Sequence, residues 1–175
     1  LHDAEIHADW NVPVRTILAE SSNIGTIEVM LTMGDTLRET KEKLGTYMRA
    51  FGLGQKTALD FPGESNGLGV DWKKWEGAEQ YTVAYGQGIA STSIQLISAI
   101  NVIANDGVYV APKLVAGTID AGGVLTGTPA SGTHRVVRPE VAQQVNLMMR
   151  QVVCEGTAKL AQVDGVTVAG KTGTG

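Results

Sequence analysis

The sequence predicts one domain of mixed helix and strand, of the α/β or α+β class, in which a helical subdomain adjoins a sheet. Two observations carry this prediction. Several segments repeat apolar residues at helical spacing, and short β-branched segments follow them, the last over residues 165–171. A chain of 175 residues, 43% of them hydrophobic, is long enough to bury one core.

The first two helices lie on either side of a Ser-Ser-Asn segment. Pro13 is a favoured first-turn residue and predicts a short helix over Val14–Glu20, after an entry loop at residues 1–12. Apolar residues recur at helical spacing over Asn23–Met33, and Gly34 is a typical stop. A short turn at residues 21–22 should therefore join the two helices.

A third helix follows Gly34. Thr36 and Glu39 have the spacing of a capping box, and Gly52 and Gly54 end the pattern. One face of this helix should be apolar, made of Leu37, Leu44, Tyr47, Met48 and Phe51. We expect the second and third helices to pack as a hairpin.

The middle of the chain combines a long loop with a further helix. Pro and Gly interrupt any periodicity over residues 55–80, which predicts a structured loop around two Trp residues. Thr92 and Gln95 form another capping-box pair, and residues 94–104 are apolar nearly all round. This helix is predicted to be fully buried.

The last third alternates strand and helix. Residues 108–110 and 114–119 have β-type composition, and Pro139 starts a helix with one apolar face. Residues 165–171 are β-branched and apolar and end in Lys171, which predicts a strand with a cation at its tip.

Composition excludes several classes of function. The net charge is −4 and no basic block is present, so the sequence offers no surface for nucleic acid. No apolar run reaches the roughly 20 residues that a membrane-spanning helix needs, so any anchor should lie outside residues 1–175. His2, Asp3, His7 and Asp9 fit no metal-ligand spacing and are interpreted as a solvated loop, so no metal is predicted.

Two short motifs remain, Ser21-Ser22-Asn23 and Lys171-Thr172-Gly173-Thr174. Each alone has an ordinary explanation, because Ser and Asn favour helix starts and a Lys-Thr-Gly sequence can end any strand. Their order resembles that of the serine penicillin-recognising enzymes, whose motifs are S-x-x-K, S-x-N and K-T-G.

The resemblance is specific to class B penicillin-binding proteins and covers nearly the whole chain. It includes FGLG at residues 51–54, Thr57, and DFPGE at residues 60–64. It continues through YGQG at residues 85–88, ANDG at 104–107, and GTA at 156–158. The YGQG stretch is more similar to enzymes of cell division than to those of elongation.

This resemblance implies a β-lactamase/transpeptidase-like fold and a peptidoglycan D,D-transpeptidase that uses no cofactor. It implies that Ser21 belongs to the proton-transfer network and that Asn23 binds the substrate backbone. Lys171 would supply positive potential, while Thr172 and Thr174 would hold the substrate carboxylate next to Gly173. The backbone N–H of Thr174 would form half of the oxyanion hole.

The same resemblance implies the partners and the location of the protein. Its substrates would be stem peptides ending in D-Ala-D-Ala, with β-lactam antibiotics as mimics and membrane proteins of cell division as further partners. It would act on the extracytoplasmic, periplasmic side of the membrane.

The nucleophile is missing from this sequence, because no Ser in the chain has Lys three positions later. The S-x-x-K motif is therefore expected upstream of Leu1, and further strands beyond Gly175, so that residues 1–175 form a partial transpeptidase domain. Two alternatives stay open: a β-lactamase-type hydrolase with the same motifs, and a penicillin-binding sensor or scaffold without turnover.

Overall fold

The computed structural model describes residues 3, 11–59 and 61–173. The α-helices of this part are α1 (Val14–Glu20), α2 (Asn23–Leu31), α3 (Leu37–Ala50), α4 (Glu79–Thr82), α5 (Ser93–Ala104) and α6 (Pro139–Cys154). Three 3₁₀ turns are η1 (Trp72–Lys74), η2 (Val83–Tyr85) and η3 (Lys159–Ala161). The strands are β1 (Val108–Val110), β2 (Gly117–Ile119), β3 (Leu125–Gly127) and β4 (Thr133–Arg135).

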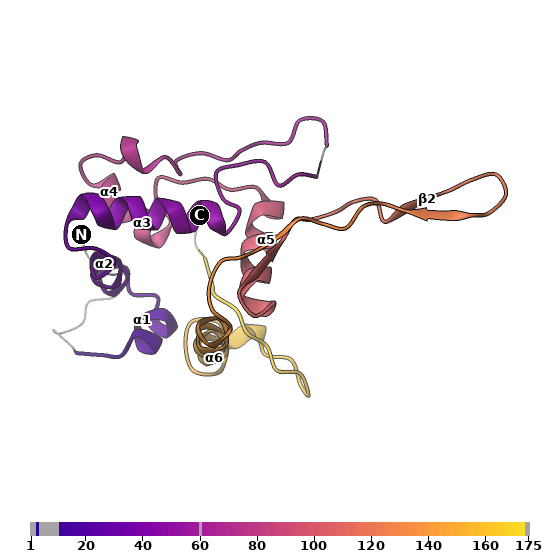
Figure 1. The fold of residues 1–175 in the computed structure, drawn as a ribbon. Helices are drawn as coiled ribbons and strands as arrows, with labels where there is room; N and C mark the ends of the chain where they lie inside the picture. Colours follow the sequence, from indigo (N-terminus) through magenta and orange to yellow (C-terminus); the bar gives the residue numbers. More distant parts are fainter. Residues whose placement is uncertain (1–2, 4–10, 60, 174–175) are drawn as a thin grey trace.

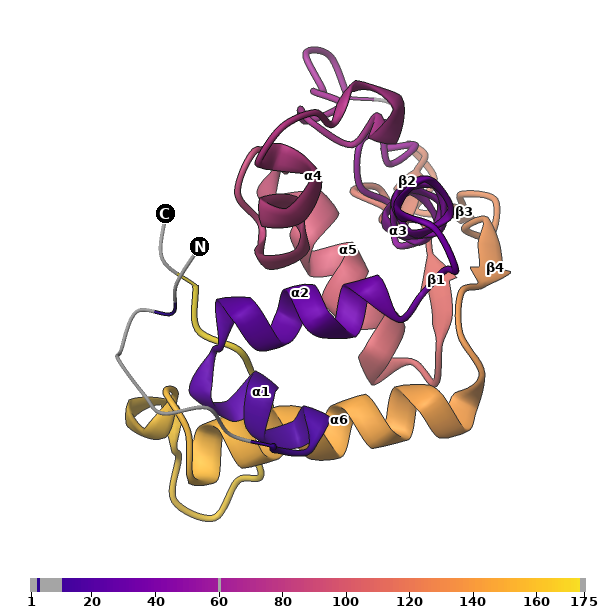
Figure 2. The ribbon, with the colours of Figure 1, turned by 90° about the vertical axis from the view of Figure 1, so that its left-hand side faces the viewer.

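Helices form the body of the molecule. Helix α1 packs along α6, and α5 packs against α6 and β1, as seen in Figure 2. The core beside α1 is built on Val152, Val153 and Ala158, with Leu18 and Val168 against them. The end of α6 therefore connects the α1 side of the molecule with the chain that leads to Lys171.

The predicted helix starts are confirmed. Helix α1 has the predicted bounds, and the Thr36 hydroxyl accepts a hydrogen bond from the Glu39 N–H at the start of α3. The capping box of Thr92 and Gln95 is complete, with both reciprocal hydrogen bonds present. These signals were readable from the sequence because each acts within one turn.

The predicted hairpin of the second and third helices is wrong. Helix α2 is seen lengthwise in Figure 2, where α3 is seen end-on, so the two helices cross steeply instead of lying antiparallel. The expected apolar stripe on α3 is only partly covered, with Tyr47 46% exposed. The buried positions of α3 are Thr40 and Gly45, and the Trp72 side chain packs on Gly45 because glycine leaves room for the indole.

Helix α5 is only partly buried, which corrects the expectation that it would be buried on all sides. Gln95, Ser98 and Val102 face inward, whereas Leu96 and Ile97 are 54% and 64% exposed. An apolar sequence shows that a face can be buried, but the packing of other elements decides which faces are covered.

The strands form two separate antiparallel pairs. Strand β1 pairs with β4, and β2 pairs with β3. In Figure 1 the β2–β3 pair extends from the body as a long arm. The segment predicted at residues 114–119 contributes only β2, and the partner strands β3 and β4 were not predicted because their residues are exposed and lack apolar alternation.

Residues 165–171 do not form the predicted strand. Val163 and Val166 make an isolated bridge, and residues 167–173 have no strand assignment. The Gly170 N–H donates instead to the Met149 carbonyl of α6 at 3.3 Å. A strand needs a neighbouring strand for its hydrogen bonds, and in the described residues this segment lies against a helix.

Within the same ranges, no helix is both long and apolar enough to cross a bilayer.

Candidate active site

The turn between α1 and α2 presents Ser21 to solvent. Ser21 ends α1 in the left-handed conformation, with φ 58° and ψ 39°. This conformation costs a non-glycine residue about 1–3 kcal/mol and persists where surrounding structure fixes it. Backbone hydrogen bonds fix it here, since the Ser22 N–H donates to the Ile17 carbonyl at 3.0 Å and the Ser21 N–H donates to Leu18 at 3.3 Å.

Ser22 and Asn23 begin α2. The Ser22 hydroxyl oxygen caps the helix by accepting from the Gly25 N–H at 2.9 Å, and Asn23 is a half-exposed residue of the first turn. The position of Asn23, two residues after Ser21, is thus set by the capped end of the helix.

Asp3 reinforces this helix start from a distant part of the sequence. Its carboxylate accepts from the Ser22 hydroxyl at 2.8 Å and from the Ile24 N–H at 2.9 Å. The interpretation of Asp3 as part of a solvated loop is therefore wrong. Sequence reasoning missed the contact because it spans 19 residues and no local pattern marks it.

Lys171 lies against the Ser21 turn although 150 residues separate them in sequence. Its Nζ donates to Ser21 Oγ at 2.7 Å and to the Thr172 carbonyl at 2.9 Å. A longer contact of 3.3 Å joins Nζ to Thr172 Oγ1. Lys171 is an exposed residue, but partial desolvation of its ammonium lowers the pKa below its usual value.

Hydrogen bonds and a close backbone approach between the end of α1 and residues 156–157 hold this contact in place. The Thr157 N–H donates to the Ala19 carbonyl at 3.2 Å, and the hydroxyls of Thr157 and Thr172 are 2.8 Å apart. A Cβ at Gly156 would come within 2.4 Å of the Ala19 oxygen, so only glycine allows this approach.

The structure brings together three of the residues selected from the sequence, Ser21, Lys171 and Thr172. Asn23 is two residues from Ser21, and Gly173 is exposed, with no other atom within 4 Å of where a Cβ would lie. Thr174 lies outside the described residues. The group combines a cation with two hydroxyls, which can relay a proton and attract a carboxylate.

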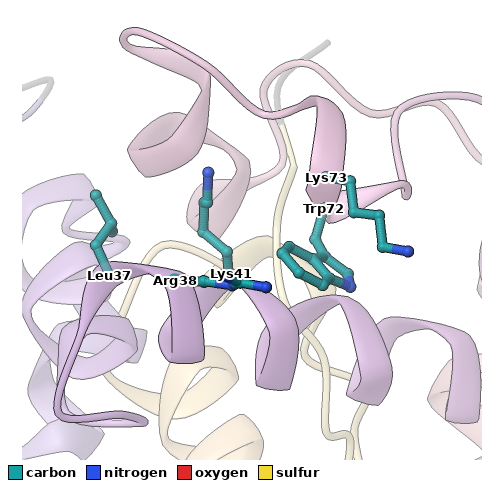
Figure 3. A pocket seen from close by; sticks show the side chains of 5 residues that line it. All are labelled: Leu37, Arg38, Lys41, Trp72 and Lys73. Atoms are coloured by element: carbon teal, nitrogen blue, oxygen red, sulfur yellow. The ribbon is translucent and has the colours of Figure 1, made fainter.

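A separate hollow of about 420 Å³ lies between α3 and η1 (Figure 3) and is lined by Leu37, Arg38, Lys41, Trp72 and Lys73. Figure 3 shows the amino groups of Lys41 and Lys73 pointing in different directions. Lys41 Nζ donates to the Trp75 carbonyl at 2.9 Å, which ties the loop to α3. The hollow shares no residue with the group around Ser21 and Lys171.

The described residues contain no cluster of three or more His, Cys, Asp or Glu able to hold a metal ion.

Comparison with known proteins identifies the family. A family model described as the penicillin binding protein transpeptidase domain matches residues 2–175. The chain belongs to this family. The resemblance drawn from the sequence motifs is thereby confirmed.

Individual relatives agree with this assignment. The chain is 35% identical to penicillin-binding protein PbpB of Mycobacterium tuberculosis, over 99% of this chain and 26% of that protein. It is 29% identical to the probable peptidoglycan D,D-transpeptidase PenA of Neisseria meningitidis, over 97% of this chain and 27% of that protein. The chain therefore spans about a quarter of the length of these curated relatives.

The fold class is confirmed by a solved structure. Penicillin-binding protein 3 of M. tuberculosis, complexed with aztreonam, superimposes with a TM-score of 0.84 at 34% identity. The match covers 93% of this chain and 37% of that one. The described helices and strand pairs are thus part of a penicillin-binding transpeptidase fold.

Proposed function

We propose that the protein containing this chain is a serine-type peptidoglycan D,D-transpeptidase, which cross-links stem peptides through an acyl-serine intermediate and is acylated by β-lactams. The observation that carries the proposal is the 2.7 Å contact between Lys171 Nζ and Ser21 Oγ within a transpeptidase domain. It joins two family motifs into one group, as a single acyl-transfer centre requires.

Each residue of this group has a distinct role in the proposed reaction. Ser21 receives a hydrogen bond from the Lys171 ammonium, so its own proton is free to be donated toward the leaving amine. Lys171 supplies the positive potential that stabilises a deprotonated nucleophile and a bound carboxylate. Thr172, Gly173 and Thr174 form the carboxylate-binding edge, and Asn23 binds the substrate backbone.

The nucleophile itself is assigned to a Ser-x-x-Lys segment upstream of residue 1, with the remaining strands of the sheet following residue 175. The support for this assignment is the absence of any Ser-x-x-Lys from the sequence of the chain. The reaction needs an activated hydroxyl, and Ser21 receives its hydrogen bond from a protonated amine, which cannot take its proton.

The cellular setting is a proposal of the same kind. We place the protein on the extracytoplasmic face of the cell membrane, held by an anchor outside residues 1–175, where stem peptides are cross-linked. The YGQG stretch at residues 85–88 supports a division-type enzyme with membrane-protein partners.

The experiment measures turnover by the complete protein. A donor peptide ending in D-Ala-D-Ala is incubated with an amine acceptor, and the cross-linked product and released D-Ala are quantified by mass spectrometry. A transpeptidase yields both products and forms a long-lived adduct with penicillin. Rapid hydrolysis of penicillin would indicate a β-lactamase instead, and an adduct without peptide turnover would indicate a sensor or scaffold.

A further inference from the structure

The hydroxyl of Thr157 lies beside the carboxylate-binding edge of the proposed site. Its Oγ1 is 2.8 Å from Thr172 Oγ1, and either hydroxyl could be the donor of this hydrogen bond. Thr157 comes from the turn after α6, whereas Thr172 follows Lys171 in the K-T-G motif. The contact therefore joins two segments that are 15 residues apart.

The hydrogen bonds around Thr172 restrict where its own proton can point. A hydroxyl has one proton to donate and two lone pairs that accept, whereas an ammonium can only donate. Lys171 Nζ lies 3.3 Å from Thr172 Oγ1 and so occupies one lone pair. If Thr157 donates to the second lone pair, the Thr172 proton is left for a group outside the protein. If Thr172 donates to Thr157, that proton is already used.

We propose that Thr157 is a positioning residue for substrate: it donates to Thr172 Oγ1 and so directs the Thr172 O–H toward the carboxylate of the stem peptide or β-lactam. An incoming carboxylate can only accept hydrogen bonds, so its arrival favours this orientation. Hydrogen bonds to a charged acceptor are roughly twice as strong as neutral ones, so the carboxylate competes well with Thr157 for the Thr172 proton. This inference rests on the proposed function.

The backbone around Thr157 is fixed well enough for such a role. Its N–H donates to the Ala19 carbonyl at 3.2 Å, two residues before Ser21. The next residue, Ala158, is 7% exposed and donates its N–H to the Val152 carbonyl at 3.1 Å. The Thr157 hydroxyl is thus held relative to both the Ser21 turn and the end of α6.

The test compares two substitutions in the complete protein. Thr157→Val keeps the shape of the side chain and removes its hydroxyl, whereas Thr157→Ser keeps the hydroxyl. Each protein reacts with penicillin and with the methyl ester of the same penicillin, which lacks the free carboxylate. Stopped-flow kinetics separate the dissociation constant of the initial complex from the rate constant of acylation.

Thr157→Val should weaken initial binding of the free acid by up to about tenfold, because losing one neutral hydrogen bond, here the one to the Thr172 hydroxyl, costs up to about 1.5 kcal/mol. The acylation rate constant should stay within about twofold, and Thr157→Ser should match the unmodified protein. With the ester, all three proteins should agree within about twofold, because no carboxylate is present to bind.

Three results would overturn the inference: an unchanged constant for Thr157→Val with the free acid, an equal loss with acid and ester, or a Ser variant as weak as Val. The second result would mean that Thr157 only supports the fold. A complete protein that free penicillin does not acylate at all would contradict the proposed function itself, and the inference with it.

Discussion

Replacing Lys171 by Met removes the ammonium and keeps the length of the side chain. The ammonium donates to Ser21 Oγ at 2.7 Å, and hydrogen bonds to charged groups contribute about 1.5–3 kcal/mol. Because about 1.36 kcal/mol corresponds to a tenfold change in rate, acylation of the complete protein should fall by about 10- to 150-fold. A time course with fluorescent penicillin measures this rate.

Folding stability should change little in the same variant. Partial desolvation lowers the pKa of Lys171, so the charged form is less favourable in the folded protein than in the unfolded chain. This unfavourable contribution applies below the folded-state pKa and disappears as pH rises toward the usual value of 10.5. Lys171→Met removes this unfavourable desolvation together with the hydrogen bonds to Ser21 and Thr172, so the two effects offset each other and the melting temperature should stay within about 2 °C.

Lys159→Met is the matched control, because Lys159 is exposed on η3 and its side chain makes no hydrogen bond to the described residues. Ser21→Ala and the double variant complete a cycle with Lys171→Met. Since the two side chains touch, their effects on acylation should be clearly less than additive. Additive losses, or an equal loss in the Lys159 variant, would refute the shared role of Ser21 and Lys171.

Three further predictions concern the frame around the site. Gln95→Leu should cost about 3–5 kcal/mol in urea unfolding, because the buried amide pairs with the Gln55 and Asn66 carbonyls at 2.7 and 3.0 Å; a loss below about 1 kcal/mol would contradict this. Asp3→Ala should cost about 1–2 kcal/mol by removing a helix cap and should slow acylation; unchanged stability would show that the cap contributes nothing. The pKa of Glu64 is lowered, chiefly by the hydrogen bond that its carboxylate accepts from the Thr57 hydroxyl. The ionised carboxylate therefore stabilises the folded protein above pH 4.5, and this stabilisation is lost as pH falls through the lower folded-state pKa. Unfolding curves at several acidic pH values should show this loss in the unmodified protein but not in Glu64→Gln.

Local signals in the sequence predicted the helices well. Pro13 and the Thr92–Gln95 pair act within a single turn, so each marks a helix start whatever packs around it. The two motifs proposed to carry the chemistry could be selected from the sequence because their order along the chain is distinctive. The 2.7 Å contact between their side chains was expected only as a consequence of a shared site.

The errors arose where distant contacts decide the structure. The burial of α5, the crossing of α2 over α3 and the absence of strand pairing at residues 165–171 depend on which elements meet in space. Asp3 is the clearest example of such an error. An aspartate near the start of a chain is usually exposed to solvent, whereas Asp3 caps α2 through contacts with Ser22 and Ile24. No periodicity or spacing rule contains such information.

The central claim is that Ser21 and Lys171 assist a nucleophile that residues 1–175 do not contain. The most direct measurement locates the covalent adduct after incubation with labelled penicillin, by intact-mass analysis followed by peptide mapping. Both the complete protein and residues 1–175 alone are measured, each with and without Ser21→Ala.

The complete protein should gain one label on a Ser followed three residues later by Lys, outside this chain, and Ser21→Ala should slow labelling without moving it. Residues 1–175 alone should gain no label, since an unactivated hydroxyl is a poor nucleophile. A stoichiometric label on Ser21, or on any other residue of this chain, would contradict the account.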